Sequence, residues 1–202
     1  MTQKNPDKQT NAERPWAIEA LVIGASTGGP KALVSVVQSL PSRVGVPIFI
    51  VQHMPAGFTA SFAKRLDSCS PIPVVEAEDG MRIQKGMVYV APGGRHMAVQ
   101  STRIKLLDTE KVHGVKPAVD LLFESAANQY EEKVAAVVLT GMGRDGTAGC
   151  LKVKQKGGYV LAQDEQSSVV YGMPKHAMEA GAVDEMASLE VVAEKVKEMV
   201  KV

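Results

Sequence analysis

Short apolar segments alternate along this chain with amphipathic segments of helical period, and this alternation constrains the fold more than any other feature. The apolar run at residues 21–23 leads into a glycine-rich turn at Gly24, and apolar positions 32, 33, 36, 37 and 40 follow with helical spacing. A second apolar run occupies residues 47–51. A strand, a turn, a helix and a strand within about thirty residues form a βαβ unit, which implies a parallel sheet.

The same alternation continues to the C-terminal end. We expect helices over residues 57–66, 118–130, 147–155, 174–180 and 188–200, and further strands over 74–75, 87–91, 134–139 and 159–162. Residues 97–100 and 103–107 are typical of an antiparallel pair at one side. The predicted fold class is α/β, a three-layer sandwich with a mostly parallel, doubly wound, Rossmann-like sheet and a small antiparallel edge.

Length and composition narrow the class of protein. A chain of 202 residues is typical of one compact domain, which we place at residues 17–202, after a polar linker or disordered segment at residues 1–16. With 23 basic and 22 acidic side chains, no field steers the chain toward nucleic acid. No apolar run approaches the roughly 18 residues that membrane insertion requires.

Cysteine and histidine usage predicts neither disulfides nor a cofactor. Cys69 and Cys150 are far apart and are expected to be buried apolar residues in a reducing compartment. The four histidines show no metal-ligand spacing, so we expect no metal site. These features are typical of a cytoplasmic globular domain.

Three chemically useful side chains each follow a predicted buried strand. Ser26 follows the first strand, His53 the second, and Asp145 comes after the strand at residues 134–139. Function in an open parallel sheet gathers beyond the carboxyl ends of its strands. Serine, histidine and aspartate are the groups of nucleophilic acyl transfer. Asp120 and Asp164 are alternatives as the carboxylate.

Each of these residues also has a structural interpretation. Gly24-x-Ser26-x-Gly28 matches the nucleophile elbow of serine hydrolases, but a glycine-rich turn equally cradles phosphate. Pro30 stands where a P-loop needs lysine, and Gln52-His53 stands where a dinucleotide site needs an acid. His53 could be a satisfied structural histidine, and Asp145 could cap the helix that follows it. We interpret His96 and His176 as structural or peripheral.

Several separate motifs, in order, closely resemble the catalytic domain of the chemotaxis receptor methylesterases, the CheB family. They cover about residues 20–185, nearly the whole predicted domain. The matching segments are Ile23–Gly29 (IGASTGG), Gln52–Pro55 (QHMP), Gly57–Thr59 (GFT), Tyr89–Gly93 (YVAPG) with His96-Met97, Pro117 with Val119-Asp120, Leu139–Gly143 (LTGMG) with Asp145-Gly146, and Tyr171–Pro174 (YGMP).

This resemblance implies an enzyme that hydrolyses glutamyl methyl esters on the cytoplasmic helices of chemoreceptors and deamidates certain receptor glutamines. Carried over by motif, Ser26 is the nucleophile, His53 is the general base and then acid, and Asp145 is the orienting carboxylate. The backbone amides of Thr27 and Met142 are the implied oxyanion donors. The implied partners are methyl-accepting chemoreceptors, a receiver domain that is separate or missing, and the chemotaxis kinase.

One departure from the family concerns regulation. Family members usually carry a receiver domain ahead of the catalytic one, and residues 1–16 resemble only the end of such a linker, so we expect an excised domain or a stand-alone homologue. The alternative function is a catalytically weak receptor-binding homologue of the same fold. The loop side chains Met54, Phe58, Met142 and Met173 are candidates for contact with a receptor helix, with plain packing as the other interpretation.

Overall fold

The computed structural model describes residues 17–202, and its centre is a seven-stranded, fully parallel sheet in the order β3-β4-β2-β1-β7-β8-β9. The expectation for residues 1–16 concerns a segment outside the described residues. The strands are β1 (Ala20–Ala25), β2 (Ile48–Gln52), β3 (Val74–Glu76), β4 (Val88–Val90), β7 (Val134–Val138), β8 (Tyr159–Gln163) and β9 (Glu185–Ala187).

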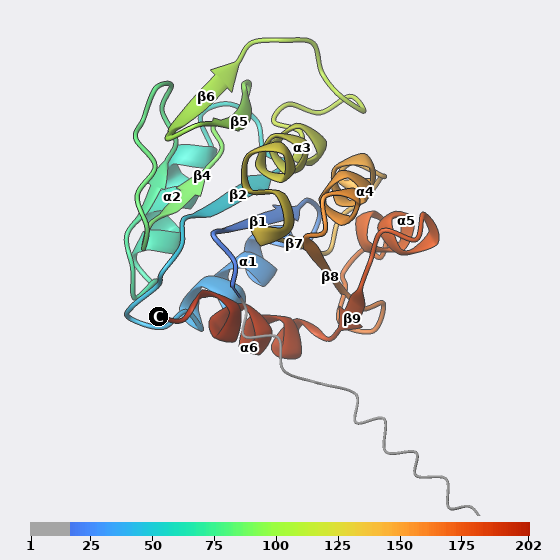
Figure 1. Ribbon diagram of the computed structural model, residues 1–202. Coiled ribbons are helices and arrows are strands. Elements are labelled where there is room, and N and C mark those ends of the chain that lie inside the picture. Colours follow the sequence, from blue (N-terminus) through green and yellow to red (C-terminus); the bar gives the residue numbers. More distant parts are fainter. Residues whose placement is uncertain (1–16) are drawn as a thin grey trace, which may run out of the picture.

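Helices cover both faces of this sheet, as two-sided burial of its strands requires (Figure 1). Along β1, Leu21 and Ile23 contact one core and Ala20 and Val22 the other. The first core lies under α1 (Gly29–Gln38), α2 (Thr59–Asp67) and α6 (Leu189–Val200). The second lies under α3 (Val119–Tyr130), α4 (Thr147–Gln155), α5 (Met173–Glu179) and a hairpin of β5 (His96–Gln100) and β6 (Arg103–Leu107).

The order of the strands creates a switch point in the middle of the sheet. From β1 the chain passes through α1 to β2 on one side, and after α3 and a short 3-10 helix (Glu131–Lys133) it returns to β7 on the other side of β1. The connections that follow β1 and β7 run to opposite sides of the sheet, and in open α/β sheets ligands bind beyond the carboxyl ends of the strands at such a point. The loops that follow β1, β2 and β7 therefore meet at one place.

The predicted α/β sandwich is confirmed, and α4 has the predicted bounds. The antiparallel pair is also confirmed, and β5 and β6 form a two-stranded sheet of their own. The edge strand β9 was not predicted, since its three residues are only half-buried and lack an apolar run. Cys150 is buried as expected, whereas Cys69 is partly exposed, and both are free. Within residues 17–202, no helix combines the length and apolar character that crossing a membrane requires.

Candidate active site

Ser26 is fixed at the carboxyl end of β1 by hydrogen bonds of its own backbone. Its N–H donates to the Thr140 carbonyl oxygen (3.0 Å). Its carbonyl oxygen accepts from the Gly29 N–H (2.8 Å) and from Gln52 Nε2 (2.9 Å). The turn into α1 passes through Gly28, whose φ of +83° lies in the left-handed region that favours glycine. The backbone of Ser26 is thus held rigidly while its side chain stays only partly buried.

His53 lies beside Ser26 because β1 and β2 are adjacent parallel strands. The last paired residues are Ala25 and Gln52, and the His53 N–H continues the ladder by donating to the Ala25 carbonyl oxygen (3.1 Å). The imidazole Nε2 lies 2.7 Å from Asp145 Oδ2. An ionised Asp145 accepts the Nε2 proton, which leaves Nδ1 as the basic nitrogen of the ring.

Asp145 is held by the N-terminus of α3, a helix distant from it in sequence. Its Oδ2 accepts from the Val119 N–H (2.6 Å) and its Oδ1 from the Asp120 N–H (3.0 Å). Burial raises the pKa of this carboxyl, but the hydrogen bond from His53 and the two helix amides together lower it below its ordinary value. Asp145 therefore remains ionised at neutral pH and holds the imidazole in one orientation.

The interpretation of Asp145 as the cap of the following helix is wrong in its choice of helix. The N-cap of α4 is Gly146, and no side chain caps that end. The amides that Asp145 binds belong to α3 instead. Gly24 allows α3 to begin so close to β1, because a Cβ at that position would lie 2.4 Å from Val119 Cγ1.

Ser26 and His53 do not share a hydrogen bond in this structure. Among residues 17–202, Ser26 Oγ has no hydrogen-bond partner, so only the His53–Asp145 half of the expected triad is closed. Hydrogen bonds between catalytic groups are often long without substrate and tighten when it binds. The three side chains come from the ends of β1 and β2 and from the loop after β7, as expected from the positions of their strands.

The two expected oxyanion donors lie on the loops that flank Ser26. The backbone amides of Thr27 and Met142 have no hydrogen-bond partner among residues 17–202. Thr140 Oγ1 ties the two regions together, since it donates to the Thr27 carbonyl oxygen (2.9 Å) and accepts from the Val170 N–H (3.0 Å). Gly141 packs directly on the serine, because a Cβ there would lie 2.8 Å from Ser26 Cβ.

The other candidate residues have structural partners. Asp164 Oδ1 accepts from the N–H and hydroxyl of Ser167 and takes no part in the site. His96 is buried, with the Ala118 N–H donating to its Nδ1 (3.0 Å) and its Nε2 2.9 Å from the Glu110 carbonyl oxygen. His176 Nδ1 lies 2.9 Å from the Gly172 carbonyl oxygen, one helical turn earlier. The buried His96 is thus structural and the exposed His176 peripheral, within the interpretation of both as structural or peripheral.

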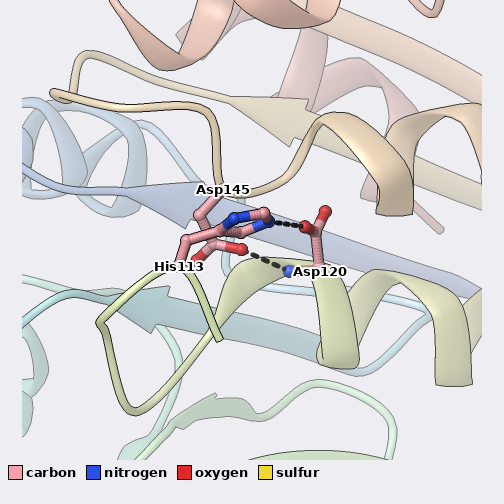
Figure 2. A group of neighbouring side chains, drawn as sticks. All are labelled: His113, Asp120 and Asp145. Atoms are coloured by element: carbon pink, nitrogen blue, oxygen red, sulfur yellow. Dashed lines mark hydrogen bonds and ion pairs between the residues drawn. The ribbon is translucent and has the colours of Figure 1, made fainter. Parts of the chain in front are cut away.

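Asp120 lies beside Asp145 but interacts with a histidine that the sequence did not single out. His113 Nε2 is 3.0 Å from Asp120 Oδ2 (Figure 2). His113, Asp120 and Asp145 could hold a metal ion, since each offers a ligand atom within 4.8 Å of the others. Each of these residues already has a hydrogen-bond partner in the protein. No spacing rule links a loop histidine to an aspartate on the next helix, so only the folded loop reveals His113.

Comparison with known proteins matches residues 21–196 to the family model described as CheB methylesterase. A protein of Clostridium acetobutylicum named protein-glutamate methylesterase/protein-glutamine glutaminase is 48% identical over 208 residues, which cover 99% of this chain and 60% of that protein. A protein of Pyrococcus horikoshii with the same name is 46% identical, and the match covers 91% of this chain and 51% of that protein. The chain thus spans little more than half the length of these relatives.

A solved structure covers the same region. The crystal structure of the Thermotoga maritima CheB methylesterase catalytic domain superposes on this chain with a TM-score of 0.86 at 45% sequence identity. The match covers 91% of this chain and 99% of that domain. The similarity therefore covers nearly the whole of the described fold.

Proposed function

Since this chain belongs to the CheB methylesterase family, we propose that it hydrolyses glutamate methyl esters on the cytoplasmic helices of chemoreceptors and releases methanol. Deamidation of receptor glutamines at the same site follows from the second activity in the names of its relatives. The observation that carries this proposal is the 2.7 Å contact between His53 and Asp145, formed where β2 ends beside Ser26.

In the proposed reaction His53 Nδ1 takes the proton of Ser26 as Oγ attacks the ester carbonyl carbon. The backbone amides of Thr27 and Met142, which lack partners within the protein, stabilise the negative charge on the carbonyl oxygen. The imidazolium then donates its proton to the leaving methoxide, and methanol departs. Asp145 stabilises the imidazolium without taking its proton.

Water completes the cycle by the same kind of steps, with water as the nucleophile and Ser26 Oγ as the leaving group. His53 takes a proton from water as the water oxygen attacks the acyl carbon, and it then donates that proton to Ser26 Oγ as the acyl–oxygen bond breaks. The released glutamic acid loses its own proton to solvent. Deamidation replaces methanol by ammonia, a poorer leaving group that must depart protonated, so we expect it to be slower. No step requires a cofactor.

Exposed apolar side chains on the loops after β2, β7 and β8 support a protein substrate. Phe58, Met142 and Val169 are 63%, 72% and 68% exposed, and they come from the loops after β2, β7 and β8. We call these three residues the apolar rim and propose that a receptor helix lies across it. Met173, another sequence candidate for this contact, is fully buried, which confirms the packing interpretation for that residue. Met54 is only partly exposed and packs on the first core.

We further propose that methyl-accepting chemoreceptors are the partners of this domain in the cytoplasm. A receiver domain, on the same chain or a separate one, is proposed as its regulator, with the chemotaxis kinase as the source of the phosphoryl group. These proposals rest on the family to which the chain belongs and on the names of the relatives.

Methanol release from methylated receptor membranes tests the proposed function. We expect Ser26→Ala, His53→Ala and Asp145→Ala each to lower the rate by roughly 10⁴-fold or more, because triad members act as a unit. Circular dichroism establishes that each variant is folded. Release at the wild-type rate by folded Ser26→Ala would contradict the proposal. A wild-type protein that binds receptor membranes but releases no methanol would favour the receptor-binding homologue.

A further inference from the structure

Two buried aspartates, Asp145 and Asp120, each accept hydrogen bonds from the N-terminal amides of a helix other than the one nearest to them in sequence. Asp145 precedes the N-cap of α4, yet its oxygens accept from the first two amides of α3. Asp120 is the second residue of α3, yet its Oδ1 accepts from the N–H of Gly149, the third residue of α4 (2.8 Å). Neither helix has a side-chain cap at its own N-cap residue. We call this exchange between Asp120 and Asp145 the cross-cap.

A histidine completes the environment of Asp120. Its Oδ2 lies 3.0 Å from His113 Nε2, and Figure 2 shows this imidazole and both carboxylates grouped at the start of α3. The Asp120 side chain is 5% exposed and that of His113 31%. His113 and Asp120 therefore form a second histidine–aspartate pair next to that of His53 with Asp145.

The helices that carry the cross-cap are in close contact. A Cβ on Gly149 would lie 2.5 Å from Phe123 Cβ and 3.2 Å from the Asp120 Cα. Glycine at this position lets α4 approach α3 closely enough for the Gly149 amide to reach the Asp120 carboxylate. Loss of the Asp120 carboxylate leaves the Gly149 N–H of α4 without its acceptor, and loss of the Asp145 carboxylate does the same to the Val119 and Asp120 N–H groups of α3. The position of Asp145 is therefore coupled to that of Asp120.

The charged form of Asp120 is also destabilised at this position. Burial raises the pKa of its carboxyl, and the neighbouring charge of Asp145 adds to this effect, against the lowering influence of the Gly149 amide and His113. Two carboxylates this close disfavour each other's charge. A buried carboxyl with a perturbed pKa beside catalytic residues is more typical of a functional site than of a helix cap.

We propose that Asp120 is a positioning residue for the esterase reaction. By accepting from Gly149 and His113 it holds the first turn of α3 against α4, and that turn carries the amides that hold Asp145 against His53. The inference rests on the proposed function. Misplacement of a catalytic group by about 1 Å can cost up to 10²-fold in rate.

The rate of Ser26 phosphonylation by a fluorophosphonate tests this role without the natural substrate. In this reaction Ser26 Oγ attacks phosphorus, fluoride leaves, and the serine proton passes to His53. We expect Asp120→Ala to lower the maximal labelling rate about tenfold or more, with the half-saturating probe concentration unchanged. Asp120→Asn keeps an oxygen for the Gly149 N–H, and its NH2 donates to His113 Nε2 when that imidazole carries its proton on Nδ1, so we expect it to recover to within about threefold of wild type.

Two further variants make the result decisive. Asp67 Oδ1 accepts from the Val74 N–H (2.9 Å) at the other end of the sheet, so Asp67→Ala removes a comparable bond and is expected to leave the labelling rate unchanged. His113→Ala removes one of the two partners of Asp120 from a partly exposed position, and we expect about threefold slower labelling. If Asp120→Ala does not fold, the other two variants at this pair carry the test.

The outcomes separate this inference from the proposed function. A wild-type labelling rate in folded Asp120→Ala or in His113→Ala would overturn the positioning role. Asp120→Asn labelled as slowly as Asp120→Ala would overturn positioning through hydrogen bonds. Failure of the wild-type protein to be labelled at Ser26 would overturn the proposed function, and this inference with it.

Discussion

Asp145 and Asp120 lie side by side but respond to burial in opposite ways. The pKa of Asp145 is lowered by His53 and two helix amides despite burial, whereas the pKa of Asp120 is raised by burial and by the charge of Asp145. The difference comes from the number of donors that reach each carboxylate. One residue therefore stabilises the folded protein when it ionises, and the other destabilises it.

This difference predicts opposite pH dependences of stability in two asparagine variants. Asp145 contributes stability that is present above its unfolded pKa of about 3.9 and is lost as the pH falls through its folded pKa. The ionisation of Asp120 costs stability as the pH rises from about 3.9 through its folded pKa. As the pH rises from about 3 to about 7, the stability of Asp145→Asn relative to wild type should therefore fall, and that of Asp120→Asn should rise.

Urea unfolding of both variants and the wild type across this pH range measures the effect. The Asp145→Asn variant also serves as the matched comparison, since both substitutions remove one buried charge at the start of α3. Parallel pH dependences in the two variants would contradict the opposite directions of the two pKa shifts.

The residues of the site differ in how far the sequence predicts their positions. Ser26, His53 and Asp145 could be chosen because each follows a buried strand of one sheet. The sequence did not identify His113 or Val169, because their places depend on how two long loops fold over the sheet edge. The same limit explains Met173, whose side chain is buried although its loop reaches the site.

At the scale of elements, the start of α3 connects packing to chemistry. Gly24 on β1 leaves room for Val119, and the Val119 amide binds Asp145. A buried strand residue thus leaves room for the helix end whose amides bind Asp145. Polar contacts alone would not have identified this dependence.

A methyl group added at Gly24 is expected to disturb both stability and reactivity. In Gly24→Ala the new Cβ would lie 2.4 Å from Val119 Cγ1, so the helix must shift, at a cost of about 1–3 kcal/mol in the free energy of unfolding. Fluorophosphonate labelling should slow at the same time. In the control Gly45→Ala the nearest atom is Val202 Cγ2 at 3.2 Å, on an exposed terminal residue that can move. Equal effects of the two variants would contradict this role of Gly24.

The loops that carry the apolar rim predict a different kinetic signature. Phe58→Ala removes an exposed ring from the loop after β2 without touching His53 or Asp145. We expect the KM for methylated receptor membranes to rise several-fold while kcat and fluorophosphonate labelling stay unchanged. Val191, an exposed residue of α6 with no place in the rim, provides the control Val191→Ala. An unchanged KM in Phe58→Ala would argue against a substrate helix lying on the rim.

At the scale of the whole molecule, the fold was predictable because both faces of the sheet are buried. The run at residues 134–139 is apolar throughout, as a strand between two helical layers must be, and it forms the interior strand β7 next to β1. The half-buried strand β9 lacks that signal and was not predicted. Strand order could not be predicted from local patterns either, because it depends on which way each connection turns.

We propose that residues 17–202 constitute the methylesterase catalytic domain and fold on their own. Deletion of residues 1–16 is then expected to leave both the thermal unfolding midpoint and the rate of methanol release unchanged. Differential scanning calorimetry and the receptor-membrane assay measure the two quantities. A clear loss of either one in the shortened protein would contradict this domain boundary.

We propose that Ser26 is the nucleophile, and covalent capture of its hydroxyl tests this role directly. Peptide mass spectrometry after fluorophosphonate treatment identifies the modified residue, while methanol release is followed in the same sample. We predict one adduct per chain, on the peptide that contains Ser26, with methanol release falling in proportion to the labelled fraction. Full activity in a protein completely labelled at Ser26, or loss of activity with the adduct on another residue, would contradict the account.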